Sequence, residues 1–205
     1  MSWRALAPLC LCLALGAARG QDLGKGVLLV ASPSLQGAYS QTLLVAVPVG
    51  ATHVGFILNR ATEVKLAALY PDHAPSAKVV DPIYFGGPEM SDSLFAVARR
   101  DPGGQSLELF GELFVTASAE SIDRIIEQTP NDARYFAGFV GWKPGELEQE
   151  INKGYWYVTD PDPSLFFRSD TGGLWEELVE RLGNGHPPQQ RRGLTPAQLS
   201  LMPTS

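Results

Sequence analysis

The chain has 205 residues, of which 44% are hydrophobic and 19% are charged, and its formal net charge is −6. This length is sufficient to bury one core of ordinary size, so we expect one domain. Acidic residues outnumber basic ones, and the lysines and arginines are not clustered, which disfavours sequence-independent binding to nucleic acid. We therefore expect no nucleic-acid partner.

Residues 1–20 have the layout of a secretory signal peptide. A positively charged start precedes an apolar run over residues 5–16 and a short segment of small residues. Ala18 and Gly20 would flank a cut before Gln21, and the apolar run is too short to span a bilayer comfortably. We expect cleavage rather than a retained anchor. The protein would then be exported, periplasmic or secreted, with no stable membrane insertion.

Both cysteines, Cys10 and Cys12, lie inside this apolar run, so the mature chain would contain no disulfide. Lipid attachment at Cys12 is disfavoured because the hydrophobic segment continues past it. Cleavage would remove two of the 16 basic residues and none of the 22 acidic ones, which leaves a formal charge of −8. The mature protein is thus predicted to be acidic and stabilised by packing alone.

Strand patterns dominate the first half of the mature chain. The apolar run at residues 26–32 predicts a buried strand. Residues 42–47 and 52–58 predict two antiparallel strands joined by a turn at residues 48–50. A short helix is expected at residues 63–69, ended by the proline that follows. Three more strands are expected at residues 83–85, 93–98 and 107–115.

Helices alternate with strands in the second half. Ser118 is expected to cap a helix that ends before Pro130. The elements expected after it are a strand at 134–140, a helix at 144–152, a strand at 155–158 and a helix at 174–182. Residues 186–205 are expected to form a disordered tail. We therefore predict an α+β fold: one compact domain over residues 21–185, with a mixed, largely antiparallel sheet flanked by helices.

The richest stretch is FAGFVGWKPGELEQEI, residues 136–151, at a strand-to-helix junction. Pro144 suits a first helical turn, which would place Glu146 and Glu150 on one face of the helix. Such a pair of carboxylates could bind a cation or act as a base. The alternative is that the acidic residues merely complement the positive helix N-terminus. Trp142 is expected either to pack in the core or to cover a ligand.

Two further stretches could recognise an anion. In GFILNR, residues 55–60, Asn59 and Arg60 follow a strand and suit a carboxylate or phosphate, although a salt bridge to an acidic residue is equally expected. FGGPE, residues 85–89, could cradle an anion on its backbone amides or form a plain tight turn. The residues concerned in the second stretch are Gly86, Gly87 and Pro88.

The three histidines, His53, His73 and His186, lack the spacing of metal ligands. We therefore expect no metal site, and nothing in the sequence indicates a cofactor. No serine lies in a GxSxG nucleophile elbow. A Ser-His-Asp arrangement could still assemble in space, with His53 or His73 as its base.

Together these stretches resemble the AlgH/YqgE family, a bacterial family without a settled biochemical activity. The motifs GVLLVASPSL, GFILNR, FGGPE, DSLF, FAGFVGWKPGELEQEI and GYWYV occur in the family's order and spacing, over roughly residues 24–175. The resemblance implies a single compact α/β domain with a mixed sheet. It also implies a role in transcription, because part of the family carries a regulator label.

Three features depart from the family. Most members look cytoplasmic, whereas this chain starts with an export signal, which argues against gene regulation. Ala61 stands where proline is usual, Glu146 where glutamine is usual, and Phe139 and Val140 replace a Tyr-Ala pair. These changes would alter a ligand pocket. The residues that set backbone geometry follow the family: Gly86, Gly87, Pro88, Gly138, Gly141, Trp142 and Gly145.

The sequence thus predicts a noncatalytic, exported protein that binds an unknown small ligand or a protein partner. The expected binding residues are Asn59, Arg60, Gly86, Gly87, Pro88, Trp142, Glu146 and Glu150. One alternative is a hydrolase or transferase that uses Glu146 or Glu150 as its base. The other is the transcriptional regulator that the family label implies.

Overall fold

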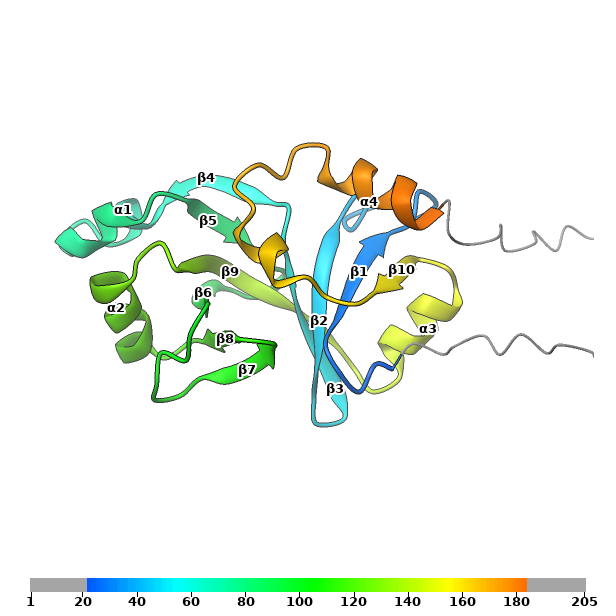
Figure 1. Cartoon of the computed structure of the whole chain (residues 1–205), viewed down its shortest axis with the longest axis horizontal. Coiled ribbons are helices and arrows are strands. Elements are labelled where there is room, and N and C mark those ends of the chain that lie inside the picture. Colours follow the sequence, from blue (N-terminus) through cyan, green and yellow to red (C-terminus); the bar gives the residue numbers. More distant parts are fainter. Residues whose placement is uncertain (1–21, 184–205) are drawn as a thin grey trace, which may run out of the picture.

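The computed structural model of the chain describes residues 22–183, and its strands build one curled sheet (Figure 1). The strands are β1 (Val27–Ala31), β2 (Leu43–Val49), β3 (Thr52–Ile57), β4 (Ala61–Lys65), β5 (Pro82–Phe85), β6 (Glu89–Ala98), β7 (Leu107–Phe110), β8 (Leu113–Thr116), β9 (Ala133–Trp142) and β10 (Trp156–Thr159). Eight of them follow the order β10-β1-β2-β3-β9-β6-β8-β7. Strand β4 pairs with β5, and β5 also pairs with β9.

Neighbouring strands are antiparallel throughout, except that β5 runs parallel to β9. The long strand β9 joins the two halves of the sheet, because it pairs with β3 near its end and with β6 near its start. The predicted α+β fold, one domain with a mixed and largely antiparallel sheet, is confirmed. Within residues 22–183 no helix is long and apolar enough to cross a membrane.

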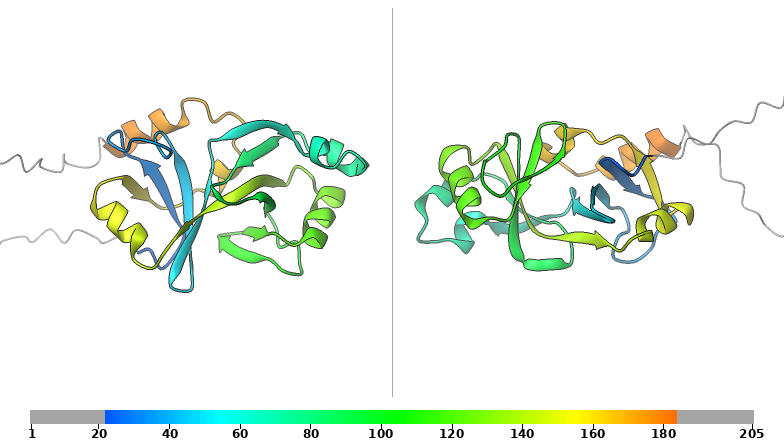
Figure 2. Two further views of the ribbon diagram at one scale, coloured as in Figure 1. Left: turned by 180° about the vertical axis from the view of Figure 1, so that it is seen from behind. Right: turned by 90° about the horizontal axis from the view of Figure 1, so that it is seen from below.

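Helices flank this sheet at its two ends. They are α1 (Leu66–Leu69), α2 (Ala119–Gln128), α3 (Glu146–Asn152) and α4 (Leu174–Gly183), with short 3-10 helices η1 (Ala74–Lys78) and η2 (Pro163–Phe167). Both views of Figure 2 place α1 and α2 at one end of the molecule and α3 and α4 at the other. The two ends therefore offer separate surfaces for function.

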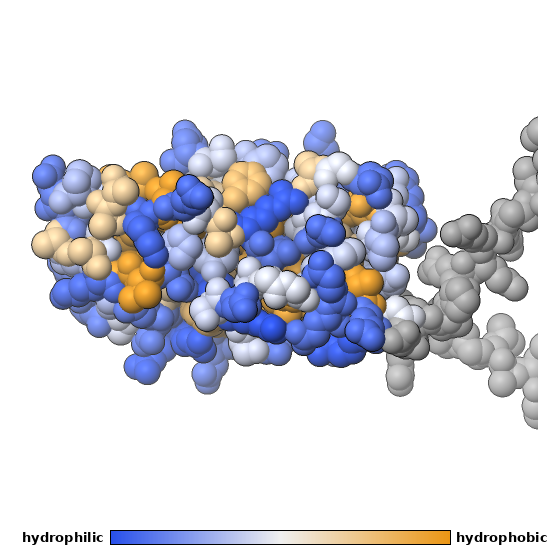
Figure 3. Space-filling model, turned by 90° about the horizontal axis from the view of Figure 1, so that it is seen from above, coloured by the Kyte–Doolittle hydropathy of each residue, from blue (hydrophilic) through white to orange (hydrophobic). Residues whose placement is uncertain are grey.

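Both faces of the sheet are covered near β1, which explains its continuous apolar run. Leu28 and Val30 point into one core, where α4 also packs, whereas Leu29 and Ala31 point into a second core with Leu147 of α3. A third core lies under α2, where the buried side chains include Ile122, Ile125, Ile126, Ala96, Ala98 and Tyr135. The surface seen in Figure 3 is mostly hydrophilic, with hydrophobic residues in separate patches.

The predicted helix at residues 63–69 is wrong over its first half. Residues 61–65 form strand β4 instead, and only Leu66–Leu69 is helical. Thr62 and Val64 are β-branched and favour an extended chain, and Thr62 Oγ1 donates to the carbonyl of Ile83 in the paired strand at 2.7 Å. Strand pairing therefore outweighs the weak helical pattern here.

Two predicted boundaries also differ. The predicted strand at residues 107–115 is a hairpin of β7 and β8, which turns at Gly111 with φ +59°. Pro48 lies inside β2, opposite His53, rather than in the turn. Proline is tolerated there because β1 pairs with β2 only as far as Ala46, so the missing amide hydrogen leaves no ladder bond unmade. The predicted signal peptide 1–20 and tail 186–205 lie outside the described residues.

Candidate functional site

Glu150 of α3 ties together the ends of β9 and β10. Its Oε2 accepts hydrogen bonds from the indole nitrogens of Trp142, at 3.0 Å, and Trp156, at 2.8 Å. The two tryptophans are only 5% and 6% exposed. The structure therefore places Trp142 in the core, and its indole N–H, which needs a partner when buried, finds one in Glu150.

Helix α3 begins at Glu146, so the prediction that Pro144 starts it is wrong. The Glu146 amide donates to the Lys143 carbonyl at 3.0 Å, and Gly145 has φ +78°. Proline at the second position and a left-handed glycine at the third are the pattern of a type II turn. Glu146 Oε2 accepts from the amide of Lys143 at 2.9 Å, so this carboxylate supports the turn that precedes the helix.

Asn59 and Arg60 hold the loop at residues 37–42 against the end of β3. Asn59 accepts from the amide of Leu43 at 2.9 Å and donates to the carbonyl of Gln41 at 2.8 Å. Arg60 Nη2 donates to Thr42 Oγ1 at 2.9 Å and to the Ala38 carbonyl. Among residues 22–183 Arg60 forms no ion pair with an acidic side chain, so the expected salt bridge is not made.

Gly86 and Gly87 let the end of β5 approach β9 more closely than any side chain allows. A Cβ at Gly86 would lie 2.2 Å from the Gly138 carbonyl oxygen, and one at Gly87 would lie 2.2 Å from the Phe139 carbonyl carbon. The Gly86 amide already donates to the carbonyl of Ala137 at 2.8 Å. Close backbone packing thus explains both glycines, and Pro88 follows them immediately before β6.

The side chain of Tyr39 lies where several predicted residues meet. Its ring packs edge-to-face on Trp156, with ring centroids 6.3 Å apart. Burial raises the pKa of Tyr39 above its ordinary value; Glu150 raises this pKa further and Arg60 lowers it, and Glu89 and Glu146 also raise it. Charged groups from three separate stretches of the sequence therefore influence the pKa of this one phenol.

The predicted residues thus have separate neighbours: Asn59 and Arg60 bind the loop at 37–42, Gly86 and Gly87 pack on β9, and Trp142 binds Glu150. The side chains of Asn59, Arg60, Trp142, Glu146 and Glu150 all form hydrogen bonds to other groups of the protein. Their proposed role as a ligand or partner surface stays a prediction.

A cavity of about 590 Å³ lies beside α2, a helix at the other end of the molecule from α3 (Figure 1). Its lining residues are Tyr70, His73, Ser93, Leu94, Ala117, Ala119, Glu120, Ile122, Asp123 and Ile126. None of the eight residues predicted from sequence is among them. A volume of several hundred cubic ångströms with a mixed apolar and polar lining is typical of small-molecule sites.

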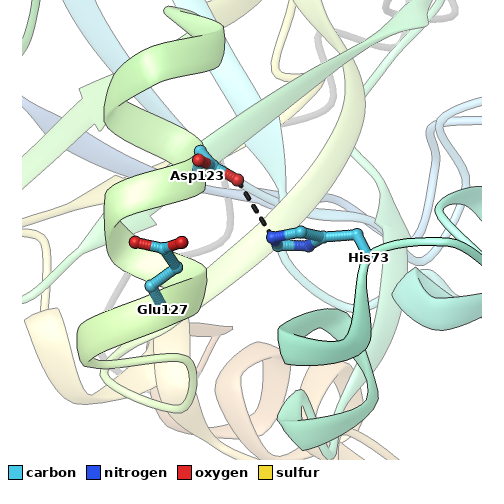
Figure 4. A group of neighbouring side chains, drawn as sticks. All are labelled: His73, Asp123 and Glu127. Carbon is cyan, nitrogen blue, oxygen red and sulfur yellow. Dashed lines mark ion pairs between the residues drawn. The ribbon is translucent and has the colours of Figure 1, made fainter.

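His73 is the most connected polar residue of this cavity. Its Nε2 lies 3.1 Å from Asp123 Oδ1, and its Nδ1 lies 2.7 Å from the hydroxyl of Ser76. The side chains of His73, Asp123 and Glu127 point toward one another, as Figure 4 shows. Ser76, His73 and Asp123 thus assemble in space, but Ser76 is fully buried, which prevents it from acting as a nucleophile on an outside substrate.

Sequence reasoning missed this cavity because its residues are scattered along the chain. His73 lies in the loop between α1 and η1, whereas Asp123 and Glu127 come some fifty residues later, on α2. The one local signal was the spacing of Asp123 and Glu127, which are four residues apart and share a helix face. Only the fold brings the histidine to that face.

The fold defines a small α+β domain with a mixed, largely antiparallel sheet. A family model described as AlgH-like matches residues 28–186. The chain therefore belongs to the AlgH-like family, as its motifs indicated.

Relatives agree with this assignment. A UPF0301 protein of Chlorobium limicola is 30% identical over 167 residues, which covers 78% of this chain and 88% of the relative. A UPF0301 protein of Streptomyces coelicolor is 31% identical over 169 residues and covers 76% and 85% of the two chains.

Two solved structures share the fold. The solution structure of the AlgH protein from Pseudomonas aeruginosa has a TM-score of 0.66 at 24% identity, covering 91% of this chain and 97% of that one. The crystal structure of protein DIP2367 from Corynebacterium diphtheriae has a TM-score of 0.64 at 23% identity, covering 81% and 88%. At these identities the likeness establishes the fold alone.

Proposed function

We propose that this protein is a noncatalytic, exported binding protein that takes a small ligand into the cavity beside α2. The cavity of about 590 Å³ carries the proposal, because its volume suits a small organic molecule. Leu94, Ile122 and Ile126 would contact apolar parts of the ligand. Tyr70 and Ser93 offer hydroxyl groups that would orient it.

The charges of the lining favour one class of ligand. Glu120 and Asp123 both line the cavity, and Arg124, the neighbouring cation on α2, pairs with Glu120 at 2.9 Å and also donates to the carbonyl of Pro102. The carboxylate of Asp123 contacts the imidazole of His73. The ligand is therefore expected to carry hydrogen-bond donors or a positive charge rather than a phosphate.

The partners of the junction glutamates support a binding role over catalysis. A general base needs a carboxylate oxygen that can accept the substrate proton. Glu150 Oε2 accepts from two indoles, and Glu146 Oε2 accepts from a backbone amide. In any activity assay that responds to this protein, Glu146→Gln should leave the rate unchanged; a rate that collapses would favour the hydrolase or transferase alternative.

A thermal-shift screen of small amines and polyols against the full chain, with a metal chelator present, tests the binding proposal. Selective stabilisation of the wild type is expected, and Ser93→Phe should abolish it because the phenyl ring enters the cavity. Arg60→Ala is the matched comparison at the opposite end. If Arg60→Ala abolishes the shift and Ser93→Phe does not, the ligand binds at the junction predicted from sequence, and the cavity proposal fails. A screen without any stabilising compound also counts against it.

Export is tested separately. The mass of the protein recovered from an exported fraction should correspond to a chain that starts at Gln21. A mass that retains Met1 would contradict cleavage, and recovery from the cytoplasm alone would contradict export. An exported location also disfavours the transcriptional role that the family label implies.

A further inference from the structure

We propose that His73, Asp123 and Glu127 bind one divalent transition-metal ion at the edge of the cavity. Each residue offers one ligand atom, an imidazole nitrogen or a carboxylate oxygen, and these atoms all lie within 4.8 Å of one another. Asp123 and Glu127 are four residues apart on one face of α2, and His73 faces them from the loop before η1 (Figure 4). The site therefore joins two elements that are distant in the sequence.

The spacing fits a shared ion. Two protein ligands of one ion, each about 2.1 Å from it, are separated by about 3.0–3.5 Å in tetrahedral or octahedral geometry. His73 Nε2 and Asp123 Oδ1 lie 3.1 Å apart, which is within that range. The Glu127 carboxylate lies within 4.8 Å of the other two ligand atoms, and because Glu127 is exposed its side chain is free to move toward an ion.

Ser76 holds the imidazole in the orientation that a ligand needs. The Ser76 hydroxyl is fully buried and lies 2.7 Å from His73 Nδ1. Metal-ligating histidines commonly donate their second ring N–H to such a partner, which fixes the tautomer. With the proton on Nδ1, the lone pair of Nε2 faces the carboxylates, where a cation would relieve the repulsion between lone pairs.

The carboxylates of the cluster are not neutralised by a lysine or arginine side chain of the described residues. Within residues 22–183 neither Asp123 nor Glu127 pairs with a lysine or arginine. The nearby Arg124 is committed to Glu120 and to the Pro102 carbonyl. Two carboxylates therefore face one imidazole, which leaves a net negative charge that a dication would neutralise.

The ligand set favours a particular class of ion. Imidazole suits zinc and other first-row transition metals, whereas calcium and magnesium prefer oxygen ligands alone. Zn²⁺ should bind more tightly than Mn²⁺, as the usual order of affinities for divalent metals requires. Three protein ligands would leave coordination positions open, and two of the ligands, His73 and Asp123, line the cavity. This inference does not rest on binding of an organic ligand.

Calorimetric titration of the full chain, freed of metal by a chelator and carrying no histidine tag, tests the site with ZnCl₂ and MnCl₂ as probes. One Zn²⁺ per chain is expected, bound more tightly than Mn²⁺. Glu127→Gln and Asp123→Asn should each weaken Zn²⁺ binding at least about tenfold, because each removes a charged ligand from the ion. Glu120→Gln is the matched control, since Glu120 is on the same helix and in the same cavity but outside the cluster.

Several results would overturn the proposal: no stoichiometric Zn²⁺ or Mn²⁺ binding, unchanged binding in both ligand variants, or equal weakening by Glu120→Gln. In the first two cases the pair of His73 and Asp123 would be an ion pair only. Circular dichroism must show that each variant folds. Because Glu127 does not line the cavity, Glu127→Gln should weaken metal binding without changing the organic-ligand shift measured with chelator present. Paramagnetic broadening by Mn²⁺ should centre on the amides of residues 73, 123 and 127, and broadening centred elsewhere would contradict the site.

Discussion

Trp142 and Trp156 donate their indole N–H groups to the same oxygen, Oε2 of Glu150, at 3.0 and 2.8 Å. The two indoles belong to β9 and β10, which do not pair with each other in the sheet. One carboxylate therefore crosslinks two strands from outside the backbone ladder. The Glu150 carboxylate thus supplies an acceptor for two buried indole N–H groups that would otherwise be unpaired.

Glu150→Ala is expected to destabilise the domain by about 2–4 kcal/mol, because it leaves two nearly buried indole donors without an acceptor. Urea denaturation followed by tryptophan fluorescence measures this change. Glu148→Ala is the control, since Glu148 is exposed on the same helix. If the two variants unfold at the same urea concentration, the Glu150 bonds do not stabilise the fold.

The close approach of Gly87, just after β5, to Gly138 of β9 gives a second prediction. Gly138 has φ +69°, and a Cβ there would lie 2.4 Å from the Gly87 carbonyl oxygen. Gly145 has a similar φ of +78° but nothing within 4 Å of its Cβ position. Gly145→Ala should therefore cost about 1 kcal/mol through backbone strain alone. Gly138→Ala should cost at least about 3 kcal/mol, because backbone atoms must also move.

The matched pair separates the two causes, and thermal or urea unfolding of both variants measures them. If Gly138→Ala is no less stable than Gly145→Ala, the backbone of β9 can shift at this point without a loss of folding free energy. In that case the positive φ angle, and not close backbone packing, would explain why residue 138 is glycine.

Local chemistry accounts for what could be predicted from the sequence. The apolar run of β1 gave a strand because it is short, continuous and bounded by glycine and proline, and the isoleucines of α2 gave a helix because they recur at helical spacing. The Lys143 to Glu146 turn was missed because proline was read as a helix start, although Pro-Gly is also the signal of a type II turn. Strand β4 was missed because its stability comes from pairing with β5, twenty residues away.

Of the two candidate sites, one could be predicted from local motifs and the other could not. Motif residues such as Asn59, Arg60 and Glu150 could be found from their local context, and Arg60 and Glu150 both influence the pKa of Tyr39. Their hydrogen-bond partners, however, are backbone groups and indoles that no local pattern specifies. The His73 cluster depends entirely on how α2 packs beside η1, and no spacing along the chain encodes that.

Alkaline pH should destabilise the domain through its buried tyrosines. Burial raises the pKa of Tyr135 well above its ordinary value of 10.0, and the pKa of Tyr84 is also raised, chiefly by burial. The unfolded chain then loses these protons first, so stability is fully present below about pH 10 and falls as the pH rises above it. Urea midpoints between about pH 8 and pH 11 should show this decline.

Tyr135→Phe should make the fall of stability with pH less steep, because it removes one group with a raised pKa. Part of the fall should remain, because the pKa values of Tyr84 and Tyr39 are also raised. The variant also loses the hydrogen bond from the Tyr135 hydroxyl to the Pro130 carbonyl, at 3.2 Å, so its stability at neutral pH should drop slightly. An unchanged slope above about pH 10 would mean that Tyr135 ionises as easily in the folded protein as in the unfolded chain.

Arg134 and Asp81 form the ion pair whose loss should matter most. The Arg134 side chain is fully buried, its Nη2 donates to Asp81 Oδ2 at 3.0 Å, and its guanidinium lies 4.1 Å from the centre of the Tyr84 ring. Asp81→Asn keeps a hydrogen-bond acceptor but leaves the buried positive charge uncompensated. We expect a loss of about 2–3 kcal/mol, the low end for a broken buried pair, because the Asp81 side chain is 37% exposed.

The surface pair of Lys25 and Asp160 provides the contrast, since its side chains are 62% and 89% exposed and its atoms lie 3.6 Å apart. Asp160→Asn should therefore change stability by less than about 0.5 kcal/mol. Urea unfolding at low and high salt compares the two variants. The cost of Asp81→Asn should be nearly independent of salt, because solvent ions do not screen a charge that is fully buried. If that cost disappears in high salt, the Arg134 guanidinium is reached by solvent and the pair behaves like the surface one.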